Sequence, residues 1–224
     1  MNSRPELYYV YGAGGHAHVV IDVLRSQGIG VKAVFDDHPE RRHPRHQDVL
    51  PGIRLAGPGN FSALDYPLIL CVGRNSERAE LVEMLNVKYG IALHPSAIVA
   101  PTSHIAEGSV ILHGAIIQSN TMIGRHALIN TAASVDHDNV IGDFVHVSPH
   151  ATLCGHVEVG EGTHIGAGAV VIPKIKIGKW STIGAGAVVI RNIPDHVTAV
   201  GNPAKILRGS HGQPLPQLAG AGRI

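Results

Sequence analysis

A histidine followed directly by an aspartate, His137-Asp138, is the pair best suited to proton transfer in this sequence. An imidazole gains and loses a proton near neutral pH, and a neighbouring carboxylate can orient it and raise its basicity. Such a pair could act as general base for an amine or hydroxyl that attacks a thioester. Two simpler interpretations remain open: a solvated turn histidine, and a surface pairing of Asp138 with His156.

A second group of residues could bind a phosphate near the start of the chain. The turn reads Gly12-Ala13-Gly14-Gly15-His16, and it separates an apolar run at residues 7–11 from a helical pattern. Backbone N–H groups at the N-terminus of a helix attract anions. Close packing of the glycines is the alternative that the sequence leaves open.

Charged residues at the ends of later strands would complete this site. An expected strand over 31–35 ends at Asp36-Asp37, where an acidic side chain can reach a ribose or a base. Arg74 and Asn75 follow an expected strand over 68–72 and are candidates for contact with phosphates or sugar. Helix capping by Asn75 or Ser76 is the alternative there.

An alternating pattern of strands and helices over residues 1–90 carries these candidates. Val20, Val23 and Leu24 lie on one face of a helix that ends at Gly28, and a second helix is expected over 75–85. The alternation predicts a small α/β domain with a parallel sheet. It has too few strands for a dinucleotide, so a single nucleotide is the expected ligand. The segment between the second and third strands, rich in His, Arg and Pro, is expected to be a solvated loop.

The second half of the chain has a fixed period of six. Every sixth residue from Leu93 to Val189 is Ile, Val or Leu, at seventeen consecutive positions. Glycines that directly follow this position, such as Gly124 and Gly142, are expected to supply positive φ angles. A short fixed period is typical of a solenoid, and hexapeptides form a parallel β-helix of triangular section. We therefore expect an all-β domain over 91–208, with five to six coils between Leu93 and Ile193.

The period also predicts neighbours, because residues one coil of 18 apart should lie side by side at about 4.8 Å. His137 then stacks on Gly155, and Asp138 lies between Asn120 and His156. Because Gly155 has no side chain, we expect room for an acyl group beside His137. Its backbone N–H could stabilise a developing oxyanion.

The run SVDHDNVIGDFVHVS at 134–148 resembles nucleotide-amino-sugar N-acetyltransferases of the bacillosamine and perosamine pathways. Sialic-acid O-acetyltransferase-like proteins share it, and residues 199–205 resemble the segment that ends the β-helix in hexapeptide acyltransferases. The resemblance implies left-handed coils, a catalytic base at His137 and a tuning carboxylate at Asp138. Many members of the family have Glu at the latter position. It further implies that acetyl-CoA is the cosubstrate, contacted by His146, Gly155, Ala167 and Ala185.

The resemblance also assigns the N-terminal half. It implies that residues 12–16, Asp36 and Asp37 hold the nucleotide of a nucleotide-sugar, and the paired aspartates favour UDP. A homotrimer is expected, because the cofactor of these enzymes lies between neighbouring prisms. The predicted reaction is N-acetylation of the 4-amino group of a nucleotide-linked 4-amino-4,6-dideoxy-sugar. Alternatives are O-acetylation of a sugar, as with sialic acid, and a non-enzymatic regulatory or scaffolding trimer.

Composition and charge bear on three further classes of function: nucleic-acid binding, membrane insertion and metal binding. The net charge of +1 does not indicate a nucleic-acid partner. No stretch reads as a signal peptide or a membrane span, so a cytoplasmic location without membrane insertion is expected. No metal is expected, because no two histidines of the repeat region have the five-residue spacing of a β-helix zinc hydratase. Residues 209–224, rich in Gly and Pro, are expected to form a mobile tail.

Overall fold

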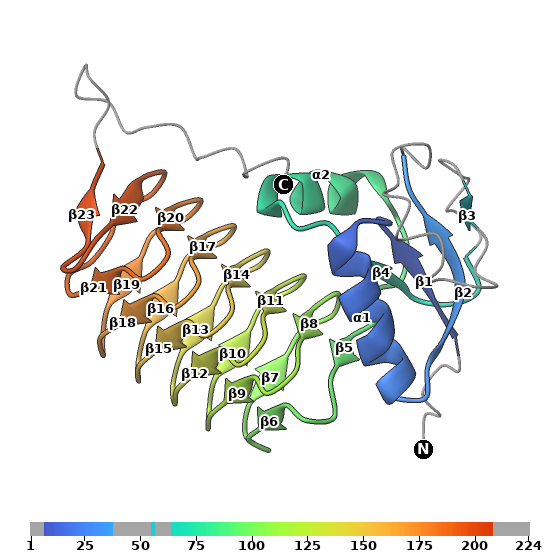
Figure 1. The fold of residues 1–224 in the computed structure, drawn as a ribbon, viewed down its shortest axis with the longest axis horizontal. Helices are drawn as coiled ribbons and strands as arrows, with labels where there is room; N and C mark the ends of the chain where they lie inside the picture. Colours follow the sequence, from blue (N-terminus) through green and yellow to red (C-terminus); the bar gives the residue numbers. More distant parts are fainter. Residues whose placement is uncertain (1–6, 38–54, 57–63, 208–224) are drawn as a thin grey trace.

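The computed structural model describes residues 7–37, 55–56 and 64–207. Figure 1 shows a small α/β domain beside a long stack of coils. The tail expected at 209–224 lies outside the described residues. Among the described residues, no helix is both long and apolar enough to span a membrane.

The N-terminal domain has the predicted parallel sheet, with strands in the order β3-β2-β1-β4. Its elements are β1 (Leu7–Tyr11), α1 (Gly15–Ser26), β2 (Gly30–Phe35), β3 (Leu55–Ala56), β4 (Leu68–Leu70) and α2 (Asn75–Met84). The short strand β3 falls within the segment expected to be a loop, so that expectation is wrong at these two residues. The third predicted strand ends at residue 70 rather than 72.

The helix α1 joins the two halves of the chain through its apolar face. Val20, Val23 and Leu24 are fully buried, as the helical pattern predicts. They belong to one apolar cluster with Val110 and Leu128, whose side chains come from the β-helix. The core of the small domain is therefore completed by the first coils.

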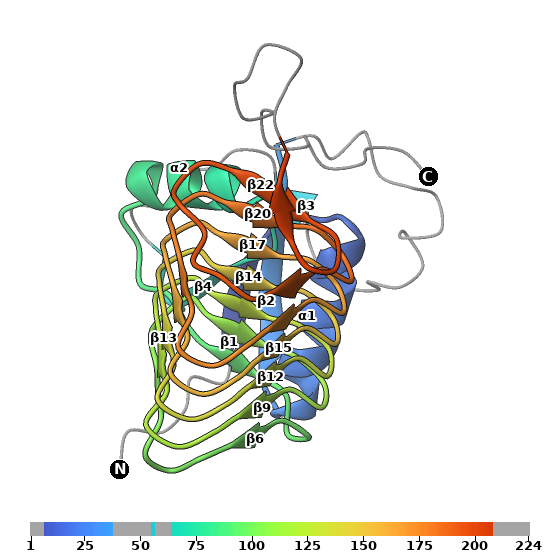
Figure 2. The ribbon, with the colours of Figure 1, turned by 90° about the vertical axis from the view of Figure 1, so that its left-hand side faces the viewer.

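The second half is a parallel β-helix built of three sheets, as the period predicts (Figures 1 and 2). Sheet 1 contains β5 (Ala92–Leu93), β8 (Val110–Ile111), β11 (Leu128–Ile129), β14 (His146–Val147), β17 (His164–Ile165), β20 (Thr182–Ile183), β22 (Thr198–Val200) and β23 (Lys205–Ile206). Sheet 2 contains β6 (Ile98–Val99), β9 (Ile116–Ile117), β12 (Ser134–Val135), β15 (Thr152–Leu153), β18 (Val170–Val171) and β21 (Val188–Val189). Sheet 3 contains β7 (His104–Ile105), β10 (Met122–Ile123), β13 (Val140–Ile141), β16 (Glu158–Val159) and β19 (Lys176–Ile177).

Each two-residue strand from β5 to β21 places its second residue toward the inside of the prism and its first residue on the outside. Ile129 and Val147, for example, are fully buried neighbours in a register of 18 residues. The last coil is two residues shorter, because Thr182 pairs with Thr198 and Ile177 with Ile193. The six-residue phase therefore does not continue to Ile193.

Three corners connect the sheets. Corner A (130–133, 148–151, 166–169 and 184–187) leads from sheet 1 to sheet 2. Corner B (118–121, 136–139, 154–157 and 172–175) leads from sheet 2 to sheet 3, and corner C (106–109, 124–127, 142–145, 160–163 and 178–181) returns to sheet 1.

Glycines at the start of corner C have a different purpose from the predicted one. Gly124 and Gly142 do not have positive φ; the left-handed position is taken by His126 (φ 53°) and Phe144 (φ 59°). A Cβ at Gly124 would lie 2.6 Å from the carbonyl carbon of Gly142, and one at Gly142 would lie 2.7 Å from a backbone nitrogen of the next coil. These glycines are required by the close stacking of coils.

Candidate active site

His137 and Asp138 form a hydrogen-bonded pair at corner B. The His137 Nδ1 lies 2.7 Å from the Asp138 Oδ2, and the His137 backbone N–H donates to the Asp136 Oδ1 at 2.8 Å. Because an ionised carboxylate only accepts hydrogen bonds, Nδ1 carries the proton and Nε2 has a free lone pair. The His137 side chain is 50 % exposed, so Nε2 is accessible to a substrate.

The pKa values of the pair move in opposite directions. The hydrogen bond that His137 donates to Asp138 raises the pKa of His137, and the nearby charge of Asp136 adds to this. The hydrogen bonds from His137 and Asn120 lower the pKa of Asp138. The arrangement is an ionised carboxylate that strengthens a neighbouring imidazole as a base.

Gly155 lies under the His137 ring, as the 18-residue period predicts. A Cβ at position 155 would be 2.6 Å from both the Cε1 and the Nε2 of His137. The imidazole itself therefore fills the space left by the missing side chain. The expectation that this space is open for an acyl group is not met directly beneath the ring.

The buried Asn139 supports the main chain below this corner. Its Nδ2 donates to the carbonyl oxygens of Asp136 at 2.7 Å and Cys154 at 3.0 Å. Our sequence reasoning did not identify this residue, although a polar side chain after the His-Asp pair at a buried corner position was the available signal.

His146 lies on sheet 1, next to corner A, in a different environment. Its Nε2 is 3.1 Å from the Asn130 Nδ2, and the Asn130 Oδ1 accepts from the Thr131 backbone N–H. The amide therefore donates to Nε2, which leaves the proton of His146 on Nδ1. The ring stacks on His164 at 4.7 Å, one coil away, and burial holds the pKa of His146 well below its usual range. His146 is thus a neutral hydrogen-bond donor.

Ala167 and Ala185 lie one coil apart at corner A and are exposed. The Gly186 N–H donates to the Ala167 carbonyl at 2.8 Å, which fixes this stack. Small side chains at this edge leave the backbone open to a ligand. Within one chain, however, corners A and B border opposite edges of sheet 2, so His137 lies apart from His146, Ala167 and Ala185.

The glycine turn of the N-terminal domain is tightly packed at Gly12 and open at Gly14 and Gly15. Gly12 has φ +101°, and a Cβ there would lie 2.9 Å from the Cys71 carbonyl oxygen, so this glycine serves packing. Around Gly14 and Gly15, by contrast, nothing lies within 4 Å of an added Cβ. Gly14 is the N-cap of α1, so the open space lies at a helix N-terminus.

The two aspartates that follow β2 contact this turn and the strand before it. The Asp36 Oδ2 accepts from the Ala13 N–H at 2.7 Å, and the Asp37 Oδ1 accepts from the Tyr11 hydroxyl at 2.5 Å. His16, the last residue of the glycine turn, lies at the junction between the domains, beside Arg78 and His126. Burial, with the charge of Arg78, lowers the pKa of His16 to about 4.

Arg74 and Asn75 lie at the start of α2 and differ in their contacts. Arg74 pairs with Glu77 at 2.7 Å and is half exposed. Asn75 donates to the carbonyl oxygens of Gly162 at 3.0 Å and Thr163 at 3.3 Å in corner C. The helix α2 has no side-chain cap, so the capping interpretation of Asn75 or Ser76 is wrong.

The buried Arg78 joins the two domains and was missed by the sequence reasoning. Its guanidinium donates to the carbonyl oxygens of His126 at 3.0 Å, Phe144 at 2.8 Å and Val72 at 2.9 Å, and to the Asn75 Oδ1 at 2.9 Å. Burial lowers the pKa of Arg78 to about 10. The two partners in the β-helix, His126 and Phe144, are 48 and 66 residues away, and no local pattern marks them.

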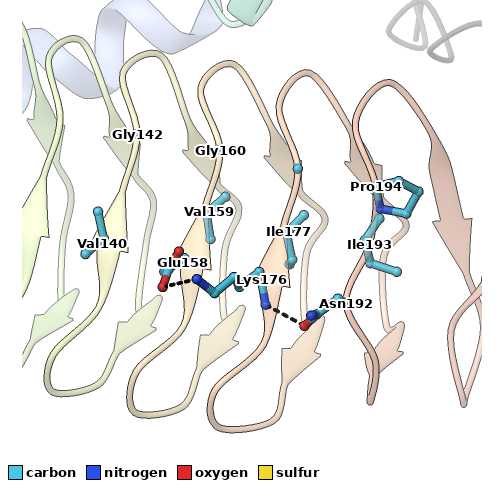
Figure 3. Close-up of a pocket in the computed structure, with 11 residues that line it drawn as sticks. Val140, Gly142, Glu158, Val159, Gly160, Lys176, Ile177, Asn192, Ile193 and Pro194 are labelled. Atoms are coloured by element: carbon cyan, nitrogen blue, oxygen red, sulfur yellow. Dashed lines mark hydrogen bonds and ion pairs between the residues drawn. The ribbon is translucent and has the colours of Figure 1, made fainter.

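A recess of about 550 Å³ lies on the outer face of sheet 3 (Figure 3). Glu158 and Lys176 form an ion pair of 2.8 Å across its strands, and the Lys176 N–H donates to the Asn192 Oδ1 at 2.9 Å. None of the residues predicted to bind substrate or cofactor lines it. The recess therefore adds nothing to the site.

Comparisons with known proteins agree with this division of the chain. The family model of the PglD N-terminal domain matches residues 8–85, and that of bacterial transferase hexapeptide repeats matches 138–173 and 156–191. A histidine-to-asparagine mutant of perosamine N-acetyltransferase from Caulobacter crescentus, in complex with CoA and GDP-perosamine, is 36 % identical with a TM-score of 0.83. That similarity covers 90 % of this chain and 97 % of the other. The chain belongs to the family of hexapeptide-repeat sugar N-acetyltransferases with a PglD N-terminal domain.

Two further solved structures are similar to this acetyltransferase over nearly its whole length. The acetyltransferase domain of PglB from Neisseria gonorrhoeae FA1090 is 33 % identical with a TM-score of 0.80, covering 90 % of this chain and 100 % of that chain. WeeI from Acinetobacter baumannii AYE is 28 % identical with a TM-score of 0.77, covering 90 % and 99 %. No match was found among the curated protein sequences. The predicted family, fold class, enzyme class and acetyl-CoA cosubstrate of this acetyltransferase are confirmed.

Proposed function

We propose that the chain transfers the acetyl group of acetyl-CoA to the 4-amino group of a nucleotide-linked 4-amino-4,6-dideoxy-sugar, with His137 as general base. The observation that carries the proposal is the His137–Asp138 pair, which leaves an accessible Nε2 lone pair above Gly155. The relatives complexed with CoA and GDP-perosamine support the substrate class. The paired Asp36 and Asp37 favour a UDP-linked sugar, whereas that relative binds a GDP-linked one.

In the proposed step, the sugar amine attacks the thioester carbonyl carbon, a C–N bond forms and the C–S bond breaks. The His137 Nε2 accepts a proton from the amine and returns it to the departing thiolate, so that amide and CoA thiol are the products. Asp138 stabilises the transient imidazolium. Among the described residues, the Gly155 backbone N–H donates to no backbone acceptor, and we assign it to the developing oxyanion.

Binding roles follow from the remaining geometry. The open space at Gly14 and Gly15 suits the diphosphate, with Ala13, His16, Asp36, Asp37, Arg74 and Asn75 around it or supporting it. His146 offers its Nδ1–H to acetyl-CoA, alongside the backbone of Ala167 and Ala185 at corner A. Burial keeps His146 neutral, so it donates without competing for the substrate proton.

A complete site requires two copies of the chain. His137 at corner B and His146 near corner A are separated by sheet 2 within one chain, so corner B of one copy must face corner A of another. The outer face of sheet 2 is largely apolar, with Ile98 64 % exposed. We propose a homotrimer. Light scattering should give three times the chain mass of 23.6 kDa, and a monomer would contradict the shared site.

Thiol release from acetyl-CoA tests the reaction. UDP-, dTDP- and GDP-linked 4-amino-sugars are supplied in turn, and mass spectrometry locates the acetyl group on nitrogen or oxygen. His137→Ala should lower kcat on the order of 10²–10⁴-fold, with little change in KM for acetyl-CoA. His104→Ala, at an exposed histidine on β7, is the control. If His137→Ala retained more than a tenth of the wild-type kcat, the assignment of His137 as general base would be wrong. If the acetyl group were found on a hydroxyl, O-acetylation would replace the proposed N-acetylation.

A further inference from the structure

The carboxylate of Asp138 contacts histidines from two successive coils. Its Oδ2 lies 2.7 Å from the His137 Nδ1 and 3.6 Å from the His156 Nε2. Its Oδ1 accepts from the Asn120 Nδ2 at 3.2 Å. The two imidazoles meet edge to face, with ring centroids 5.2 Å apart. Asp138 therefore contacts both His137 and His156, so the two interpretations of this carboxylate hold at the same time.

The backbone fixes this arrangement. Asn120, Asp138 and His156 occupy the same left-handed position of corner B in three successive coils, with φ of 60°, 56° and 60°. The His156 N–H donates to the His137 carbonyl at 3.0 Å, and the Asp138 N–H donates to the Ser119 carbonyl at 2.9 Å. The register of the β-helix thus keeps the His156 side chain beside the carboxylate.

We infer that His156 is a positioning residue that moderates the base: it shares the carboxylate of Asp138 with His137 and, once protonated, places a positive charge beside the His137 ring. A positive charge there disfavours the imidazolium form of His137, opposite to the effect of Asp138. The link to catalysis rests on the proposed function. The other charged residues of corner B are Asp136, in the same coil, and Lys174, which holds the same corner position one coil beyond His156.

Three substitutions separate the charge of His156 from its contact. His156→Ala removes both, and Ala132 shows that alanine adopts the equivalent left-handed position of corner A (φ 52°). His156→Asn keeps a donor but cannot become charged, and Asn120 sets the precedent for the backbone. His156→Lys supplies a permanent charge, as Lys174 already does at the equivalent position (φ 65°). The backbone therefore tolerates all three types.

The readout is the pKa of His137, followed by NMR of full-length protein labelled with ¹³C at histidine Cε1. The His137 resonance is assigned from its absence in His137→Asn. EDTA is included, since ligand atoms of His137, Asp138 and His156 lie within 4.8 Å of one another and could bind a contaminating metal. The pH dependence of kcat/KM is measured on the same samples.

We expect the pKa of His137 to be higher in His156→Ala than in the wild type and lower in His156→Lys. The pKa of His137 should differ by about half a pH unit between His156→Ala and His156→Lys, as expected for charges roughly 5 Å apart in water. The acid limb of the kcat/KM profile should move with it. His104→Asn should leave the pKa unchanged.

An unchanged His137 pKa across the three variants would overturn the inference, as would an equal shift in His104→Asn. If every His156 variant transferred acetyl groups and the acid limb of its kcat/KM profile stayed at the wild-type pH, the moderating role would be overturned. The proposed function would remain intact. If the wild type released no thiol, the proposed function would fail, and the NMR titration would still decide whether His156 moderates His137.

Discussion

The imidazole of His137 occupies the space that a side chain at Gly155 would need, since a Cβ there would lie 2.6 Å from the ring. Gly155→Ala should therefore displace the base from its position. Misplacement by about 1 Å can cost on the order of 10²-fold in rate, so we expect kcat to fall roughly 10- to 100-fold. Steady-state kinetics by thiol release measure the loss.

Thermal unfolding of the same variant provides the control, because a general disruption of the coil would lower Tm together with activity. Gly155 does not have a positive φ, so backbone strain does not add to the effect. A kcat within twofold of the wild type would show that the ring can move aside without consequence.

Asp138→Asn should shift the acid limb of the kcat/KM profile to lower pH. The hydrogen bond of Asp138 is the main cause of the raised pKa of His137, and removing its negative charge disfavours the imidazolium. The active, unprotonated base should then persist at lower pH, while its weaker basicity lowers the limiting rate. Asp136→Asn should give a smaller shift of the same sign. An upward shift in either variant would reverse our electrostatic assignment.

Asp36→Ala should weaken binding of the nucleotide-sugar and leave acetyl-CoA binding nearly unchanged. The carboxylate holds the Ala13 N–H at 2.7 Å and so fixes the turn that we assign to the diphosphate. Isothermal titration with each ligand separates the two affinities, and a loss on the order of tenfold corresponds to one hydrogen bond to a charged group. Equal losses for both ligands would exclude a separate nucleotide site in the N-terminal domain.

Arg78→Met should destabilise the chain by about 2–4 kcal/mol, because it leaves buried carbonyl oxygens on both domains without a donor. Denaturant unfolding measures the change. Arg25→Met, on the exposed side of α1, is the matched control and should change stability by less than about 0.5 kcal/mol. Equal effects of the two substitutions would refute a structural role for the buried guanidinium.

The fold was predictable because one repeated feature determines most of it. A constant six-residue phase gives the sheets, the register and the contact of His137 with Gly155. The sequence could also place Asp138 between Asn120 and His156, since each of these residues is 18 positions from the next. What it could not reveal is which contact Asp138 makes, because side-chain distances of 2.7 and 3.6 Å depend on rotamers rather than on period.

Predictions failed where contacts cross long stretches of chain or where the period stops. Asn75 looks like a helix cap locally, yet its amide reaches carbonyl groups 87 and 88 residues away. Arg78 has no local signature for the same reason. The strand β3 has only two residues, and its pairing with β2 is a tertiary contact that local composition does not reveal.

The apolar cluster shared by α1, Val110 and Leu128 has a consequence for exchanging parts between relatives. The chain cannot be cut cleanly near residue 90, since the side chains that cover α1 belong to β8 and β11. A graft intended to change nucleotide preference would have to carry the outer residues of these coils, together with the carbonyl-bearing turns that receive Arg78. The unit of exchange is therefore the small domain plus the flank on which it rests.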